Sequence, residues 1–269
     1  MTWRPWQDLL ALVELAAPSA CAGCGRAGVR WCHLCQHALA GAPPRSWRPT
    51  PCPAGLPPTW SGPAYEEAVR TAVVAWKDGG RADLTGVLAP VLRDVLAAAL
   101  AGSPQHRAAL VAGAPVAVVP APSARASTRR RGEHRVRSLV TAAVGGTPPL
   151  RVVDALELSR RVADQAGLGA AERHRNLAGA VRVRARRAAG VAGVPCVLVD
   201  DVVTTGATLA ECARALRRVG CGPVVAVTLA ATRRRGGARP GAPARTPQPS
   251  ADGAARDRGV PLSVPGRAD

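Results

Sequence analysis

The sequence predicts an α/β protein in which helices flank a parallel sheet, with a small N-terminal four-cysteine module and a disordered basic C-terminal tail. Three observations predict this arrangement. Over residues 64–231, short apolar runs alternate with stretches of helical spacing, as in parallel sheets that are covered on both faces. Two CxxC pairs lie within residues 1–40. Residues 232–269 are mostly Arg, Pro, Gly and Ala without periodicity, which is typical of a disordered tail.

The expected elements follow from the periodicity of the apolar residues. Helical spacing predicts helices over residues 65–76, 84–100, 138–144 and 209–219, and apolar runs predict strands over 115–119, 151–158, 194–199 and 222–229. Residues 41–63 are rich in proline, so we expect a poorly structured connector there. Segment 6–17 favours an amphipathic helix over a signal peptide, because Asp8 and Glu14 interrupt its apolar run.

The chain is strongly basic, with 36 Lys and Arg against 18 Asp and Glu and a formal net charge of +18. Clustered arginines can neutralise phosphates, which favours a nucleic-acid surface. Lys77 is the single lysine, however, and abundant Ala, Arg, Gly and Pro are equally typical of a GC-rich genome, so a solvated arginine surface stays open. No run reaches the roughly 20 apolar residues of a membrane span. We therefore expect a cytoplasmic protein.

Two CxxC pairs separated by seven residues are formed by Cys21, Cys24, Cys32 and Cys35. A reducing compartment disfavours disulfides, and four thiolates can enclose a tetrahedral Zn²⁺ with no open coordination position. The pattern therefore predicts a structural zinc site, whose metal could fold a module too small for its own core. A redox CxxC is the alternative, and His33 or His37 could replace one cysteine ligand.

The sharpest motif begins at residue 197, where an apolar strand leads into two adjacent carboxylates, Asp200 and Asp201. A turn of small and hydroxyl residues follows, made of Val203, Thr204, Thr205, Gly206, Ala207 and Thr208. Ligands of open parallel sheets bind beyond the carboxyl ends of strands, and the positive end of the next helix favours a phosphate there. The carboxylates can accept hydrogen bonds from two neighbouring sugar hydroxyls. These features indicate a ribose 5-phosphate site. The alternative is a purely structural feature, in which an acidic strand end precedes a Thr-capped helix.

This string resembles the motif that binds phosphoribosyl pyrophosphate (PRPP) in type I phosphoribosyltransferases. Residues 1–231 are similar to the ComF family, which couples a zinc-ribbon-like module to such a domain. The segments that agree in order are the two CxxC pairs, Tyr65, Lys77-Asp78-Gly79-Gly80, Val118-Val119-Pro120-Ala121-Pro122, Arg130-Arg131-Gly132, and Gln165, Arg173 and Asn176. The resemblance implies a type I phosphoribosyltransferase-like fold over residues 64–231.

The resemblance also implies a chemistry for the motif. Asp200 and Asp201 would bind the ribose hydroxyls, loop 203–208 would bind the 5-phosphate, and Mg²⁺ would bridge pyrophosphate and ribose oxygens. The reaction would displace pyrophosphate from C1 of PRPP, which depends on positioning and electrostatics. The candidates that would stabilise the pyrophosphate belong to one arginine-rich segment, unless it is a solvated loop: Arg125, Arg129, Arg130 and Arg131.

Two functions stay open at this point. The first is a PRPP-dependent transferase with an unidentified acceptor. The second is a non-catalytic PRPP sensor or accessory factor, because members of the ComF family are linked to DNA uptake during natural competence. The partners of an accessory factor would be single-stranded DNA or a protein of the competence machinery. The sequence identifies neither the acceptor nor the oligomeric state.

Overall fold

The computed structural model describes residues 19–122, 134–159 and 179–233. These residues belong to the first of two compact units, Met1–Arg234. Several predictions lie outside the described residues: the helix at 6–17, the arginines at 125–131, Gln165, Arg173 and Asn176, and the tail beyond residue 233.

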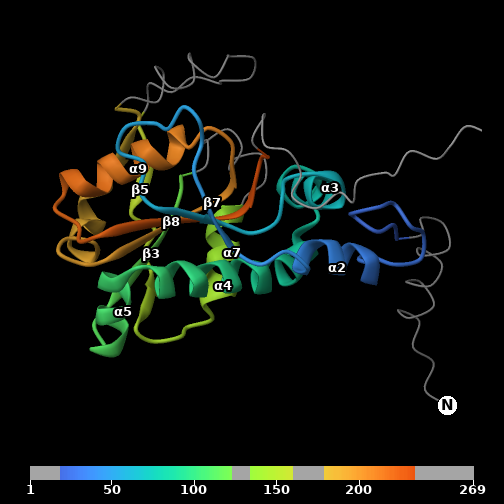
Figure 1. The fold of residues 1–269 in the computed structure, drawn as a ribbon, viewed down its shortest axis with the longest axis horizontal. Coiled ribbons are helices and arrows are strands. Elements are labelled where there is room, and N and C mark those ends of the chain that lie inside the picture. The colour runs from blue at the N-terminus through green and yellow to red at the C-terminus, as the bar shows by residue number, and fades with distance from the viewer. Residues whose placement is uncertain (1–18, 123–133, 160–178, 234–269) are drawn as a thin grey trace, which may run out of the picture. The chain divides into compact units, whose positions relative to one another are not determined.

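A six-stranded sheet forms the centre of this unit (Figure 1). Its strands lie in the order β1-β2-β8-β7-β3-β4. All neighbouring strands pair in parallel except β1 and β2, which are antiparallel. Their bounds are β1 Arg45–Trp47, β2 Thr59–Ser61, β3 Val116–Pro120, β4 Leu150–Val152, β7 Cys196–Val203 and β8 Val224–Ala231. The predicted α/β class with a mostly parallel sheet is therefore confirmed.

Helices cover both faces of this sheet, with α4 on one side and α9 on the other (Figure 1). A second, two-stranded antiparallel sheet pairs β5 Leu156–Leu158 with β6 Val181–Val183. The helices are α2 His33–Ala40, α3 Glu67–Lys77, α4 Thr85–Gly102, α5 Pro104–Val111, α7 Arg135–Val144 and α9 Ala207–Arg218, with short 3₁₀ helices at Ala82–Leu84 and Ala185–Gly190.

Two apolar cores lie on the two faces of the sheet, because its central strands are apolar on both sides. Every residue of β3 and β8 is buried. One core joins the sheet to α3, α4 and α7 and contains Trp76, and the other joins it to α9 and contains Leu216. Since the chain has no Phe, Val, Leu and Ala supply most of both cores.

The segment Ala82–Gly102, which includes α4, is long and apolar enough to span a membrane by length and composition alone. Half of its most apolar window is buried inside the protein. Its residues Leu88, Leu92 and Val95 have no exposed surface and belong to the same core as Val227 of β8. The position of α4 in the core of this unit accounts for the apolar composition of the segment.

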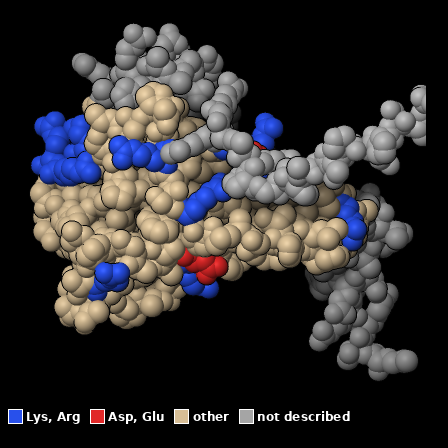
Figure 2. Space-filling view, in the orientation of Figure 1, with Lys and Arg blue, Asp and Glu red and all other residues tan. Residues whose placement is uncertain are grey.

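On the face drawn in Figure 2, Lys and Arg form several separate patches. Some arginines pair with carboxylates: Arg182 lies 2.9 Å from Glu157, and Arg233 lies 2.8 Å from Glu66. Part of the positive charge is therefore compensated by neighbouring carboxylates.

The proline-rich segment 41–63 contributes more structure than the sequence predicts. It forms β1 and β2, and β2 extends the sheet by pairing Thr59 with Ala226 of β8. No proline lies inside either strand, so the missing proline N–H groups cost no sheet hydrogen bond. The predicted strand 151–158 divides into β4 and β5, which belong to different sheets. The chain changes direction near Asp154, whose carboxylate pairs with Arg184 at 3.0 Å.

Candidate functional site

The acidic pair lies within β7 and not after it. The strand continues to Val203, beyond the predicted end at residue 199, because it keeps pairing with β8 as far as Val203 and Ala231. Asp200 is half-buried, and Asp201 has 4% of its surface exposed. Since adjacent residues of a strand point to opposite faces, the two carboxylates have different surroundings.

Lys77, the last residue of α3, forms an ion pair with Asp201. Burial alone would lower the pKa of Lys77, but the charge of Asp201 raises it above its usual value. Burial, and then the negative charge of Asp201, raise the pKa of Asp200 to about 7. The pair therefore contains one carboxylate that Lys77 compensates well and one that favours additional cations or hydrogen-bond donors.

Backbone amides fix the orientation of both carboxylates. The N–H of Asp201 donates to Oδ1 of Asp200 at 2.9 Å, and the N–H of Val202 donates to Oδ1 of Asp201 at 2.7 Å. Hydrogen bonds of this kind to an ionised acceptor are short and strong. The side chains are therefore held in place before any ligand arrives.

The loop after β7 is short. Thr204, Thr205 and Gly206 connect the strand to α9, which begins at Ala207 and not near the predicted residue 209. Gly206 has a φ of 78°, a left-handed conformation that glycine adopts without strain. A Cβ atom at this position would also lie 3.1 Å from the side chain of Leu56. The positive φ therefore favours glycine at this position, and a larger residue would also have to displace the side chain of Leu56 slightly.

The predicted loop lines a small hollow of about 30 Å³, and its walls are Asp200, Val202, Val203, Thr204, Thr205, Gly206, Ala207, Thr208 and Leu209. The N–H groups in the first turn of a helix have no carbonyl partner within that helix, and the helix dipole is positive there. An anion is therefore favoured at this end of α9. The structure brings together Asp200 and all six predicted loop residues, and it places Asp201 behind them against Lys77. Arg130 and Arg131 lie outside the described residues.

A buried carboxylate fixes α9 to the smaller sheet. Glu211 accepts the backbone N–H of Val181 at 3.1 Å and pairs with Arg214 at 2.6 Å. Arg214 also donates to the carbonyl oxygen of Val181 at 3.1 Å. Burial opposes ionisation of Glu211, but the hydrogen bonds from Arg214 and Val181 keep its pKa below the usual value. These contacts hold the helix whose first turn forms the hollow.

A divalent cation fits the acidic pair. Carboxylate oxygens are ligands that Mg²⁺ prefers. Burial, and then the charge of Asp201, raise the pKa of Asp200 to about 7, and a divalent cation beside Asp200 would favour its ionised form. Asp200, which borders the hollow, is the residue that would face such a cation.

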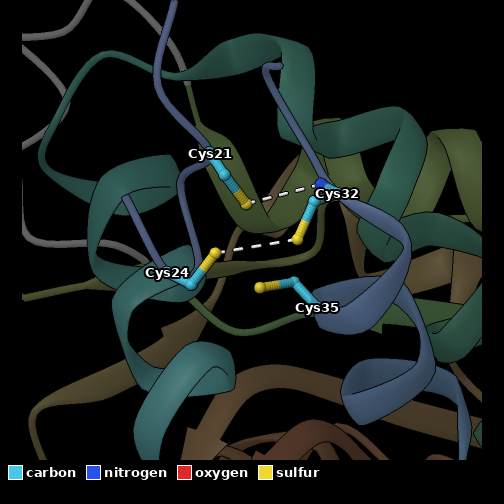
Figure 3. A group of neighbouring side chains, drawn as sticks. All are labelled: Cys21, Cys24, Cys32 and Cys35. Carbon is cyan, nitrogen blue, oxygen red and sulfur yellow. Dashed lines mark hydrogen bonds between the residues drawn. The ribbon is translucent and has the colours of Figure 1, made fainter. Parts of the chain in front are cut away.

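The four predicted metal ligands lie together. The sulfur atoms of Cys21, Cys24, Cys32 and Cys35 are all within 4.8 Å of one another, and Figure 3 shows them pointing toward a common centre. The sulfur atoms of Cys24 and Cys32 are 3.6 Å apart. Four sulfurs at about 2.3 Å from a tetrahedral zinc ion would be about 3.8 Å apart. The cluster therefore has the size of a closed Cys₄ metal site, and neither histidine alternative belongs to it.

The surroundings of the cluster suit thiolate ligands. Burial raises the pKa of Cys21, but backbone N–H groups outweigh it and lower the value to about 6; one of them, from Cys32, lies 3.4 Å from the Cys21 sulfur. Burial and the neighbouring thiols raise the pKa of Cys35. A metal would overcome this by binding the thiolate. Gly23 leaves the space that the cluster needs, because a Cβ atom there would lie 2.5 Å from the sulfur of Cys35.

Two parts of this arrangement are not evident from the motif alone. Nothing in the sequence indicates that Lys77 reaches Asp201, which is far away along the chain. Glu211 and Arg214 are spaced by three residues, so a helical ion pair could have been expected. Their joint contact with Val181 depends on the packing of β6.

Comparison with known protein families matches residues 150–248 to the phosphoribosyl transferase domain. The match covers β4 to β8, including the acidic pair and α9. A search of curated proteins found no match. The region that carries Asp200, Asp201 and the loop Thr204–Thr208 is therefore similar to a phosphoribosyl transferase domain, and a four-cysteine cluster precedes it.

Proposed function

We propose that this protein binds PRPP and transfers its phosphoribosyl group to an acceptor with release of pyrophosphate. One observation carries the proposal: the acidic pair of β7 is followed at once by a glycine-containing loop and the start of α9. These features lie in the region matched to the phosphoribosyl transferase domain. A cytoplasmic location belongs to the same proposal, since a four-thiol metal site suits a reducing compartment.

The proposed reaction is a substitution at C1 of the ribose. The bond between C1 and the pyrophosphate oxygen breaks, and its electron pair leaves with pyrophosphate. The acceptor atom forms the new bond to C1 and loses its proton. Positive charge develops on the ribose ring and negative charge on the leaving group, so fixed charges contribute most to catalysis.

The described residues have defined parts in this reaction. Asp200, which borders the hollow, holds the ribose hydroxyls. Asp201 lies behind it against Lys77, and the charge of the pair favours the developing positive charge on the ring. The loop 204–208 holds the 5-phosphate through backbone N–H groups and threonine hydroxyls. Mg²⁺, when bound with PRPP, supplies positive charge at the pyrophosphate. We assign the same task to Arg130 and Arg131 from the family resemblance.

Calorimetry with PRPP and Mg²⁺ tests the proposal. The wild type should bind, and Asp200→Asn/Asp201→Asn should bind at least about tenfold more weakly, since one lost charge-assisted hydrogen bond accounts for a factor of that size. Asp94→Asn, which changes an exposed carboxylate on α4, is the matched control and should bind like the wild type. A wild type that binds no PRPP would overturn the site assignment.

Pyrophosphate release distinguishes a transferase from a sensor. The wild type is incubated with PRPP, Mg²⁺ and a panel of purine, pyrimidine and amine acceptors. Release that depends on one acceptor identifies the reaction. If the protein binds PRPP but releases no pyrophosphate with all members of the panel, the sensor alternative is favoured.

The finer assignment to the ComF family is part of this proposal. Its support is the order of features along the chain, with the Cys₄ cluster preceding the phosphoribosyl transferase match. The cluster is proposed to hold a structural Zn²⁺. Metal analysis of the purified protein should find about one zinc per chain, and Cys21→Ser/Cys24→Ser should lose it.

A second candidate function is binding of a nucleic acid, in keeping with an accessory role in DNA uptake. A cavity of about 410 Å³ is lined by Arg151, Arg186 and Arg187. It lies beside the first residues of β3, beside Arg151 and Val152 of β4, and near Val194, which precedes β7; the acidic pair lies toward the other end of β7. Three guanidinium groups around one cavity favour a polyanion.

Anisotropy of a labelled single-stranded DNA at several salt concentrations tests this candidate. In Arg186→Gln/Arg187→Gln the slope of log K against log salt should fall by about 1.4, because each phosphate contact contributes about 0.7 for a single strand. Arg70→Gln, which changes an exposed arginine of α3, should leave the slope unchanged. An unchanged slope in the double variant would exclude this cavity as the DNA surface.

A further inference from the structure

We propose that Arg81 couples the cysteine cluster to the acidic pair, so that the N-terminal module positions Lys77 beside Asp201. Arg81 follows Lys77 by four residues, in the segment that connects α3 to α4. It is therefore a positioning residue and not a catalytic one. The coupling between the cysteine cluster and Lys77 needs no ligand. Its expected effect on the affinity for PRPP rests on the proposed function.

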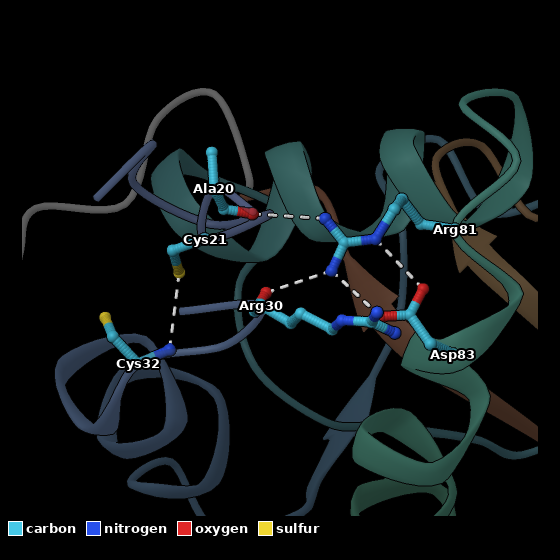
Figure 4. A network of polar contacts seen from close by, with 6 residues as sticks. All are labelled: Ala20, Cys21, Arg30, Cys32, Arg81 and Asp83. Carbon is cyan, nitrogen blue, oxygen red and sulfur yellow. Dashed lines mark hydrogen bonds and ion pairs between the residues drawn. The ribbon is translucent and has the colours of Figure 1, made fainter. Parts of the chain in front are cut away.

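The guanidinium of Arg81 contacts the two chain segments that carry the cysteines (Figure 4). Its Nη1 donates to the carbonyl oxygen of Ala20 at 3.2 Å, and its Nη2 donates to the carbonyl oxygen of Arg30 at 3.0 Å. Ala20 directly precedes the first CxxC pair, and Arg30 lies just before the second. One side chain thus joins both halves of the metal site to the segment after α3.

Asp83 orients this guanidinium. Its carboxylate accepts from Nε of Arg81 at 2.9 Å and from Nη2 at 2.8 Å. A two-pronged pair of this kind fixes the plane of the guanidinium. The remaining N–H groups then point at the carbonyl oxygens of the module. Arginine suits this position because its planar guanidinium can donate to Asp83 and to the backbone carbonyl oxygens at the same time, in fixed directions, whereas the ammonium group of lysine has no such fixed geometry.

The segment between Lys77 and Arg81 is itself tied to α3. The backbone N–H of Asp78 donates to Val74 at 2.8 Å, and that of Arg81 donates to Ala75 at 3.1 Å. A displacement of Arg81 is therefore transmitted to the last turn of α3, which carries Lys77. Because Lys77 pairs with Asp201, the position of the module affects the charge balance of the acidic pair.

Apolar packing also holds the N-terminal module. The competing explanation is that this packing, and not Arg81, positions the module. Leu39 of α2 has no exposed surface and belongs to the core that contains Trp76. If this packing alone positions the module, loss of the Arg81 side chain will not loosen the segment 77–84. If Arg81 is the link, that segment will loosen while the core stays intact.

Hydrogen exchange followed by mass spectrometry separates the two explanations. In Arg81→Ala, amides of residues 77–84 should exchange about tenfold faster, as expected for the loss of one charge-assisted hydrogen bond. Arg81→Lys should show an intermediate rate. Arg107→Ala is the matched control, because Arg107 donates to a backbone carbonyl, that of Ala101, at 2.8 Å in a different part of the fold. It should leave the segment unchanged.

Metal occupancy provides the second arm of the test. The wild type is measured with its zinc and after chelation, with metal content and unfolding recorded for each sample. Metal loss should speed exchange at 77–84 in the wild type and should add little in Arg81→Ala, where the link is already broken. Unchanged exchange at 77–84 in Arg81→Ala, or an undiminished response of that variant to chelation, would overturn the inference.

PRPP affinity gives a readout specific to Lys77. Arg81→Ala should weaken binding, and Lys77→Ala/Arg81→Ala should bind no more weakly than Lys77→Ala alone, because both changes act through the same ammonium group. Additive losses would contradict this route. If the wild type binds no PRPP, the proposed function fails, and the exchange experiment still decides whether the coupling exists.

Discussion

Replacing Lys77 by Met removes the cation that compensates Asp201 while keeping the apolar stem of the side chain. Breaking a fully buried ion pair costs about 3–5 kcal/mol, whereas an exposed pair contributes about 0–1 kcal/mol. The side chain of Lys77 is 44% exposed and that of Asp201 is 6% exposed, so water screens the pair in part. We therefore expect Lys77→Met to lower the free energy of unfolding by about 1–2 kcal/mol.

The sign of the pH dependence follows from Asp200. Its pKa is about 7 in the folded protein and about 3.9 in an unfolded chain. Between these values the folded state binds more protons than the unfolded state, so this group lowers stability as pH rises. Without Lys77 the ionised pair is compensated less, and the decline in stability toward high pH should be steeper in Lys77→Met.

Urea unfolding at about pH 5 and about pH 8 measures both effects. Lys77→Met/Asp201→Asn should regain most of the loss, because it no longer buries an uncompensated charge. Arg70→Met, on the same helix, serves as the control for removal of a surface cation. The reasoning is refuted if Lys77→Met unfolds like the wild type at about pH 8, or if its deficit is the same at both pH values.

Three further predictions concern other parts of the chain. Gly206→Ala should destabilise the protein by about 1 kcal/mol and weaken PRPP binding, because alanine is strained at positive φ; urea unfolding and calorimetry measure this, and an unperturbed variant would exclude the tight turn beside Leu56. Gly23→Ala should reduce zinc content, since its Cβ would displace the Cys35 sulfur; retention of full zinc would contradict the geometry. Burial lowers the pKa of His106, so the folded state binds fewer protons and stability should fall as pH drops below about 6.5. His106→Gln should flatten that decline in urea unfolding, and an equal decline would exclude His106 as its cause.

The central sheet could be predicted because its strands are continuous apolar runs. Residues 115–119, 194–199 and 222–229 each gave a strand of the sheet, and each of the four helical patterns gave a helix. The prediction failed to find β1 and β2, which are three residues long and lie among prolines. Such short strands carry no period, and pairing with β8 decides their conformation.

The candidate site was predictable wherever its residues are neighbours along the chain. The string 203–208 was found in order, and its members line one hollow. The extent of β7 was underestimated, because two charged residues end an apolar run in the sequence although β8 continues to pair with them. The contact of Lys77 with Asp201 depends on how α3 packs against the sheet, which no local pattern encodes.

The pairing of distant segments determines which part of the chain can fold by itself. A fragment limited to the matched residues 150–248 would keep the β7–β8 pair but would lose β3 beside β7 and β2 beside β8. Both strands would then become open edges, which invite pairing between chains. During synthesis, β2 emerges long before its partner β8, and β3 emerges long before its partner β7; such pairing between distant segments favours slow folding. The candidate site is thus completed only when β8, which pairs with β7, has been made.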